Sequence, residues 1–406
     1  MPETLERTEA RAGNRSQVAP WQYLQVSWEA PGETRFRRNL RRRAEAARRA
    51  WADVYAEDRR DASGLLVPPR AHWCGQSGYG AGSVDVVADG HGGGKVSHLR
   101  YCNHVLTCPV CSEIIRRKRA EEIMDGLGRH LHGGGGVLFM TMTVSHGRGD
   151  SLEQLMDVMT DAMRRLKGRS AWRRFKRESG YIGYIVSLEA TYGQNGWHPH
   201  RHFAIVLDRS ATPGEVAAWA DELKESWVDS VAASGGRATY GRGLDLQLAN
   251  TPGAVANYIA KEIVNEYDTK EGRDSIVPFQ LLDGRTPESV RLWKEWVGAA
   301  RGKNAIRWTP GLKSRLGVGE MSDADITAEH DRAAAGERVA ASIDSPLYDK
   351  MHNDGATIEQ VRSAVLAGDY DHAAAILGCG WYWVVVDGES RPMFARFTGH
   401  LDRRRE

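Results

Sequence analysis

The centre of the chain alternates between two hydrophobic periods. Residues 134–144 are mostly apolar, which predicts a buried strand, and residues 151–168 place apolar positions at helical spacing. Two further segments with the composition of strands, 180–192 and 197–207, flank the sequence GQNG at 193–196. Because glycine and asparagine favour tight turns, this pattern predicts two strands joined as a hairpin.

The pattern continues with a predicted helix over 212–234, a strand over 243–249 and a helix over 252–266. A hairpin with helices elsewhere favours an α+β fold, in which a central sheet rich in antiparallel pairs is flanked by helices. A doubly wound parallel sheet would instead need a helix between successive strands.

The flanks differ from this centre. Residues 34–60 lack glycine and proline and predict a basic helix, whereas the region from His72 to Cys111 is rich in glycine, turns and cysteine. After Pro310 we expect helical stretches at 324–342 and 358–377 and a hairpin at 381–397, as a winged-helix-like module would have. We therefore divide the chain into a basic helical segment, a cysteine-rich element with a basic helix, a central domain, and a mainly helical C-terminal segment, with boundaries at 1–70, 71–125, 126–310 and 311–406.

Composition limits which partners and which cell compartment can be expected. The 406 residues carry a net charge of only +2, so charged partners must be inferred from local blocks. No apolar segment is long enough to span a bilayer, and the first residues lack the order of a secretory signal. We expect a cytoplasmic protein that does not enter a membrane, whose five cysteines stay reduced.

The second hairpin strand carries three histidines at alternate positions. His198, His200 and His202 would share one face of the strand. If the turn is 193–196, Glu189 lies directly opposite His200, with Cβ atoms roughly 5 Å apart. Glu189, His200 and His202 would then form a site for a divalent cation with open coordination positions, with His198 as an alternative ligand. The competing interpretation is a solvated strand end, and a one-residue slip would remove Glu189 from this face.

Four of the cysteines lie close together in the sequence. Two of them form the knuckle CPVC, which places two thiolates for one tetrahedral ion. We expect structural zinc, with His72 and His104 as substitute ligands if one cysteine is not used. Buried reduced cysteines are the alternative interpretation. The predicted ligands are Cys74, Cys102, Cys108 and Cys111.

A second group of candidates lies downstream. Tyr258 and Lys261 are three residues apart on the predicted helix 252–266 and so share a face. A tyrosine can attack phosphorus when a cation favours its phenolate, which otherwise forms near pH ~10. Alone, the pair is more typical of a packed tyrosine beside a solvated lysine.

Basic residues gather around two aromatic ones at 164–177. Such a mixture can neutralise phosphates and stack unpaired bases, although charge runs are often only solvated faces. The basic helix 34–60 could contact duplex DNA in the same way. The candidate DNA-binding residues are Arg164, Arg165, Lys167, Arg169, Trp172, Arg173, Arg174, Lys176 and Arg177.

Three of these segments, in this order, resemble the motifs of HUH endonucleases. They are TMT at 141–143, HPHRH at 198–202 and YIAK at 258–261, and they are most similar to those of rolling-circle plasmid replication initiators of actinobacteria. The cysteine-bearing segment before them also resembles one in such initiators. Two positions depart from the pattern: Arg201 stands where an apolar residue is usual, and Ala254 stands where some relatives have a glutamate that ends replication. Glu262 is a candidate substitute.

The resemblance implies an HUH nuclease fold and a reaction. Tyr258 would attack one phosphodiester of single-stranded or hairpin origin DNA, with Mg²⁺ or Mn²⁺ at the histidines and with flanking duplex, a host helicase and a polymerase as partners. A 5′-phosphotyrosine and a free 3′ hydroxyl would result. Alternatives are a relaxase or single-strand transposase of the same superfamily, and a zinc-containing DNA-binding regulator without catalysis.

Overall fold

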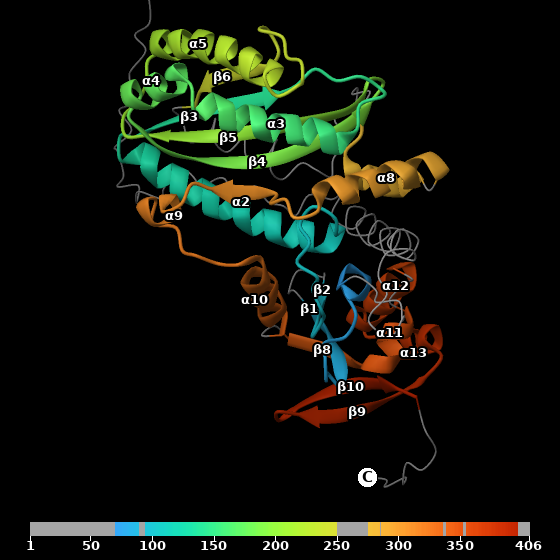
Figure 1. Cartoon of the computed structure of the whole chain (residues 1–406). Coiled ribbons are helices and arrows are strands. Elements are labelled where there is room, and N and C mark those ends of the chain that lie inside the picture. Colours follow the sequence, from blue (N-terminus) through green and yellow to red (C-terminus); the bar gives the residue numbers. More distant parts are fainter. Residues whose placement is uncertain are drawn as a thin grey trace, which may run out of the picture.

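The computed structural model describes residues 70–88, 94–249, 275–284, 286–335, 338–351 and 355–396 (Figure 1). A central five-stranded sheet has the order β6-β3-β5-β4-β7, and all of its pairs are antiparallel. The α+β fold with an antiparallel-rich sheet flanked by helices is therefore confirmed. The strands are β3 (Gly136–Thr143), β4 (Tyr181–Gly193), β5 (Gly196–Leu207), β6 (Leu244–Leu248) and β7 (Ile306–Trp308).

Helices cover both faces of this sheet. The helices α3 (Leu152–Lys167), α4 (Ser170–Glu178) and α5 (Pro213–Ala232) pack on one face, together with α8 (Pro287–Ala300). The long helix α2 (Pro109–His132) crosses the other face (Figure 1). We call these the α3 face and the α2 face.

The alternation along the strands sorts side chains between the two layers. On β3, Met140 and Met142 join the apolar core under α3, whereas Val137 and Phe139 join the core under α2. Successive strand residues point to opposite faces, so both layers are specified by near-continuous apolar runs. The prediction of buried strands from such runs is confirmed.

A second five-stranded sheet joins segments that are far apart in the sequence. Its order is β2-β1-β8-β10-β9, and β1 (Ser83–Ala88) pairs antiparallel with β8 (Arg338–Asp344). The segments 71–125 and 311–406, which the predicted division places apart, therefore contribute strands to the same sheet. The remaining strands are β2 (Gly94–Ser97), β9 (Gly380–Val386) and β10 (Glu389–Ala395).

The expected C-terminal helices are shorter than predicted. The stretch 324–342 is helical only as α10, which ends at Ala335, because the residues after it pair with β1 as β8. The stretch 358–377 divides at Asp369, whose side chain caps a new helix. The expected hairpin is present as β9 and β10. The helices of this part are α10 (Asp323–Ala335), α11 (Ser345–Met351), α12 (Gly355–Leu366) and α13 (Tyr370–Leu377).

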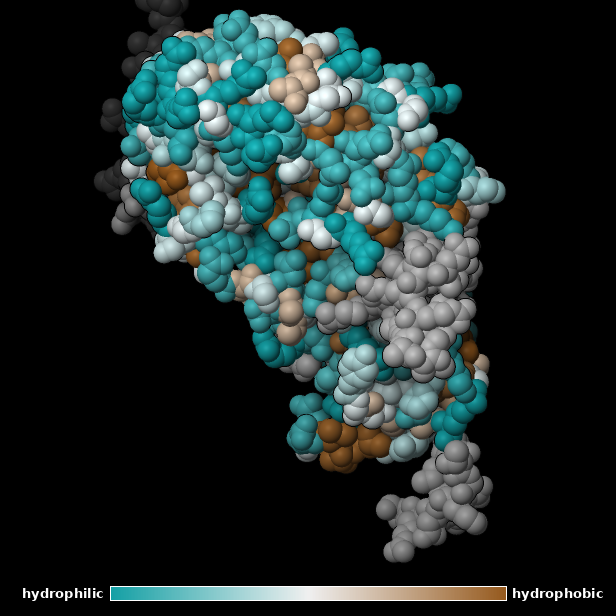
Figure 2. All heavy atoms as spheres, in the orientation of Figure 1, coloured by the Kyte–Doolittle hydropathy of each residue, from teal (hydrophilic) through white to brown (hydrophobic). Residues whose placement is uncertain are grey.

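Short elements complete the described chain: η2 (Arg70–Trp73), η4 (Pro278–Gln280), α7 (Leu281–Gly284) and α9 (Leu312–Arg315). Hydrophilic side chains cover most of the visible face of the central-sheet unit (Figure 2). An apolar patch lies over the β9–β10 hairpin, where Trp383 and Val385 are exposed. Within the part of the chain that is described, no helix has the length and hydropathy of a membrane span. The basic helix expected at 34–60 lies outside the described residues.

Candidate metal centres and nucleic-acid interface

The β4–β5 hairpin brings three potential metal ligands together. Its register pairs Tyr192 with Trp197 and Glu189 with His200, as the turn predicted. Gly196 sits in the turn at φ +86°, and a Cβ atom there would lie 3.0 Å from the Gly147 carbonyl oxygen. Glycine at this position therefore helps to hold the register on which the cluster depends.

The three side chains converge on the α2 face of the sheet. His202 Nε2 lies 2.8 Å from Glu189 Oε2, and His200 Nδ1 lies 3.8 Å from the same oxygen. One ligand atom from each residue falls within 4.8 Å of the others. Ligands of a divalent transition ion, each about 2.1 Å from it, are themselves roughly 3 to 3.5 Å apart. The Glu189–His200–His202 group could therefore hold a metal ion after small side-chain movements.

The charge state of the group suits a cation. Burial by itself would raise the pKa of Glu189, but hydrogen bonds and charge from His200 and His202 outweigh it and hold that pKa far below its usual range. The carboxylate is therefore anionic at neutral pH. His202 Nδ1 lies 3.2 Å from Thr141 Oγ1, which orients the ring so that Nε2 faces the carboxylate.

His198 occupies a neighbouring position on the same face. Its Nε2 lies 3.0 Å from His200 Nε2 and 2.9 Å from Thr143 Oγ1, and it is not part of the three-ligand group. Burial, followed by charge repulsion from His200 and His146, lowers the pKa of His198 to about 3, so its ring is neutral at pH 7. His146, whose ring centroid is 4.4 Å from that of His198, was not singled out in the sequence because it follows β3 in a loop.

The four cysteines of the N-terminal element form a second group. Their Sγ atoms are mutual neighbours: Cys74 and Cys111 are 3.5 Å apart, as are Cys108 and Cys74, and Cys102 and Cys111 are 3.7 Å apart. These separations are far too long for disulfide bonds. Four sulfurs placed 2.3 Å from a tetrahedral ion lie roughly 3.8 Å apart, so the cluster has the dimensions of a four-thiolate zinc site.

The surroundings of the cysteines also favour a bound cation. All four are buried, and the backbone N–H of Asn103, which is left-handed at φ +62°, donates to Cys111 Sγ at 3.4 Å. Hydrogen bonds from the other three thiols lower the pKa of Cys108 well below its usual value. Hydrogen bonding with Cys108 in turn raises the pKa of Cys102. The cluster thus already stabilises one thiolate, and the set could hold a metal ion.

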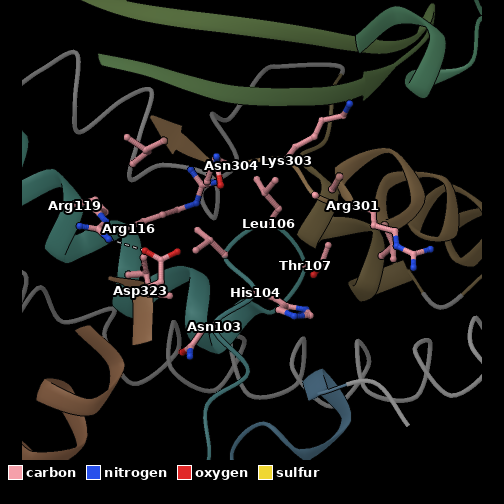
Figure 3. Close-up of a pocket in the computed structure, with 17 residues that line it drawn as sticks. Asn103, His104, Leu106, Thr107, Arg116, Arg119, Arg301, Lys303, Asn304 and Asp323 are labelled. Atoms are coloured by element: carbon pink, nitrogen blue, oxygen red, sulfur yellow. Dashed lines mark hydrogen bonds and ion pairs between the residues drawn. The ribbon is translucent and has the colours of Figure 1, made fainter. Parts of the chain in front are cut away.

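The loop between these cysteines borders a polar hollow of about 470 Å³ (Figure 3). Trp296 of α8 donates its indole N–H to the Leu106 carbonyl oxygen at 2.8 Å, which docks the loop against the helix. Arg116 and Arg119 extend into the hollow from α2. Arg119 meets Asp323 at 2.8 Å, so part of the positive charge on this wall is neutralised. The candidate substitute ligand His104 lines this hollow and is outside the four-cysteine group.

The basic block 164–177 divides into two sets. One set, of five arginines, is already paired with carboxylates, whereas Lys167, Arg173 and Lys176 line a hollow of about 520 Å³. Trp172 is only 3% exposed and packs against Phe175 at a centroid distance of 5.5 Å, so in this arrangement its ring belongs to the core. The paired set is Arg164 and Arg165 with Asp161, Arg169 with Asp229, Arg174 with Glu222 and Arg177 with Glu178.

The predicted nucleophile, Tyr258, and its partner Lys261 lie outside the described residues, as do Ala254 and Glu262. The segment follows Ala249, immediately after β6. The assignment of these four residues stays a prediction.

Comparison with known proteins gives two kinds of match. A family model described as "Replication protein" matches residues 93–219, a span that contains three of the four cysteines and the Glu189–His200–His202 group. The "Protein rep" of Streptomyces lividans is 28% identical over 363 residues, which cover 70% of this chain and 79% of that protein. The "Neomycin resistance protein" of Streptomyces cyanogenus is 29% identical over 218 residues, covering 43% and 48% respectively. No solved structure matches. The matching family and the S. lividans relative confirm the resemblance to plasmid replication initiators of the actinobacterial type.

Proposed function

We propose that this protein initiates rolling-circle replication of a plasmid by nicking, and later rejoining, one strand of origin DNA. The observation that carries the proposal is the convergence of Glu189, His200 and His202 on one face of an antiparallel sheet. The similarity to replication proteins over the same residues supports it.

Three residues would hold the divalent ion, and a fourth would orient one of them. Glu189, His200 and His202 would hold a divalent ion, Mg²⁺ or Mn²⁺, with Thr141 fixing the orientation of the His202 ring. Such an ion would withdraw negative charge from the nonbridging phosphate oxygens. Two imidazoles and one carboxylate leave coordination positions open for those oxygens.

The proposed reaction is a transesterification. The phenolic oxygen of Tyr258 forms a bond to phosphorus while the bond from phosphorus to the 3′ oxygen breaks. The phenolic proton is lost, with Lys261 favouring the phenolate, and the departing 3′ oxygen gains a proton from solvent. One phosphodiester is exchanged for another, so the 3′ hydroxyl can attack the phosphotyrosine and rejoin the strand without ATP.

The cysteine cluster would have a structural role. Zinc held by Cys74, Cys102, Cys108 and Cys111 would hold the loop that follows Cys102 against the N-terminus of α2. That helix crosses the face of the sheet on which the Glu189–His200–His202 group lies.

One experiment tests the nuclease proposal. Single-stranded oligonucleotides covering the plasmid origin, labelled at their 3′ ends so that the label stays on the fragment that carries the 5′ phosphate, are incubated with the protein and Mn²⁺. We expect a covalent protein–DNA band from the wild type and from Tyr240→Phe, an exposed tyrosine that bonds Asp221, and none from Tyr258→Phe. An adduct with Tyr258→Phe would refute the assigned nucleophile.

The metal ligands require a separate comparison. His200→Ala and His202→Ala should abolish nicking but retain origin binding, whereas His372→Ala, on the exposed surface of α13, should keep both activities. A wild-type protein that binds origin duplex specifically but nicks no strand would favour the non-catalytic regulator instead.

A further inference from the structure

Arg201, the residue between the two ligand histidines, points away from them. Adjacent residues of a strand face opposite sides, so Arg201 projects toward the α3 face while His200 and His202 face α2. Its Nη2 donates to Thr160 Oγ1 of α3 at 2.9 Å. The Nε atom of Arg201 is buried and has no hydrogen-bond partner among the described residues.

A second guanidinium lies on the same face. Arg307 of β7 pairs with Val186 of β4, and Arg201 of β5 pairs with Leu188 of β4. The two arginines therefore stand on either side of β4, on strands roughly 10 Å apart, with the side chains of Val186 and Leu188 between them. Both side chains line one hollow.

In the described part of the chain, no acidic group pairs with either arginine. Among the residues whose positions are described, neither Arg201 nor Arg307 has a carboxylate within 4.0 Å. The nearby Arg164 and Arg165, by contrast, share Asp161. Holding the half-buried Arg201 near the exposed Arg307 is unfavourable unless an anion joins them.

The space beside the two arginines is a groove. A hollow of about 220 Å³ is lined by Thr160, Arg201, Lys303 and Arg307. Arg307 also lines the 520 Å³ hollow that contains Lys167, Arg173 and Lys176, so the two hollows meet at this residue. Figure 3 shows the Lys303 side chain extending away from the hollow drawn there, toward the ribbons of the central sheet. We call the combined surface the basic groove.

The groove suits a phosphate backbone better than bases. The ring of Tyr184 is covered by Lys167 Nζ at 4.7 Å from its centroid, and the ring of Tyr181 by Lys176 Nζ at 4.8 Å. Covered aromatic faces cannot stack bases, whereas the cations above them and the paired guanidiniums present hydrogen-bond donors suited to phosphate oxygens. Arg201 is recessed beside α3, a position that the phosphates of a single strand reach more readily than those of a rigid duplex.

We infer that the basic groove binds the backbone of a single DNA strand without reading its sequence, and that one phosphate sits between Arg201 and Arg307. The inference rests on the proposed function, because it assigns a path to the DNA strand that is nicked. Since β7 is the edge of the central sheet, a strand bound at the Glu189–His200–His202 group would pass around this edge to reach the opposite face.

Binding is measured by fluorescence anisotropy with a labelled oligo(dT) over a range of NaCl concentrations, without added Mg²⁺ or Mn²⁺. We expect Arg201→Met and Arg307→Met each to weaken binding about tenfold, since a charge-assisted hydrogen bond contributes about that much. The slope of log affinity against log salt should fall by about 0.7, the value for one phosphate of a single strand. The double variant should be little worse than either single one, because both arginines hold the same phosphate.

Controls separate this effect from other causes. Arg291→Met removes an exposed arginine of α8 that is already paired with Glu288 and should bind oligo(dT) like the wild type. Arg201→Lys keeps the charge but loses the forked donor geometry, so we expect an intermediate affinity. Thermal melting of each variant shows whether it is folded. Inorganic phosphate is also added as a competitor. If it displaces oligo(dT) only at concentrations at which any salt does so, the groove is a site for the DNA backbone. Displacement at lower concentrations would instead indicate a site for a free oxyanion.

The outcomes distinguish this inference from the proposed function. If the wild type nicks origin DNA but folded Arg201→Met and Arg307→Met bind oligo(dT) with unchanged affinity and salt slope, the groove assignment is wrong and the nuclease proposal stands. If no strand is nicked but both variants lose oligo(dT) binding, the groove stands and the nuclease proposal fails. A loss confined to duplex DNA, or an equal loss in Arg291→Met, would overturn the single-strand assignment.

Discussion

Thr141→Val tests which histidines bind the divalent ion. For His202 to present the lone pair of Nε2 to a metal, its proton must lie on Nδ1, which can then donate to Thr141 Oγ1 at 3.2 Å. Valine keeps the shape of threonine and removes that acceptor. Loss of such an outer partner typically lowers metal affinity 10- to 100-fold, about 1.4 to 2.7 kcal/mol. Because 3.2 Å is at the long end for a hydrogen bond, we expect a loss near tenfold.

Thr143→Val is the matched control. It lies two residues along the same strand and face, and its hydroxyl lies 2.9 Å from His198 instead. If His200 and His202 are the ligands, Thr143→Val should change the affinity less than twofold. If His198 and His200 are the ligands, the two variants should exchange their effects.

The measurement is a titration of zinc-loaded protein with Mn²⁺, with free Mn²⁺ counted by electron paramagnetic resonance. Manganese prefers imidazole and carboxylate to thiolate, so the four-cysteine cluster does not compete. The reasoning is refuted if Thr141→Val binds Mn²⁺ as tightly as the wild type while retaining the wild-type melting temperature.

Three further changes probe the scaffold. Cys108→Ser should lower bound zinc from about one ion per chain to near zero by elemental analysis, whereas Cys379→Ser, outside the cluster, should retain it. Gly196→Ala should cost about 1 to 2 kcal/mol in urea denaturation because φ is +86° and the new Cβ would meet the Gly147 carbonyl, while Gly149→Ala, with open space around it, should be near neutral. Glu122→Ala should lower the free energy of unfolding by about 3 kcal/mol in the same assay. Glu122 pairs with two largely buried cations, Arg119 at 2.9 Å and Lys313 at 3.1 Å, which the substitution leaves without this carboxylate. A cost below about 1 kcal/mol would show that these cations find other partners.

The hairpin and its cluster could be predicted because the information is local. A glycine-flanked turn fixes the register of two adjacent strands, and a period of two then determines which side chains share a face. Tyr192 opposite Trp197 and Glu189 opposite His200 follow from that step alone. The cysteine group was accessible for a similar reason, since the knuckle at 108–111 brings two thiolates together by its own spacing.

The second sheet could not be predicted in this way. Pairing of β1 with β8 joins residues about 250 positions apart, and no turn links them to fix a register. The sequence therefore predicted a helix through 324–342, where helical propensity and strand pairing compete, and strand pairing prevails after Ala335 because β1 offers a partner.

The sequence by itself determined the α+β class, the hairpin register with its Glu189–His200–His202 group, and the cysteine pair at 108–111, because each depends on neighbours in the chain. Only the tertiary structure decided that Trp172 lies in the core and that most arginines of its block are already paired. It also decided the position of Arg201, the residue that fitted the motif least. Arg201 lies on the face of the sheet opposite to His200 and His202, beside Arg307. Such charge pairs depend on how strands and helices pack, and the burial that gives them their energetic weight arises only when the layers come together.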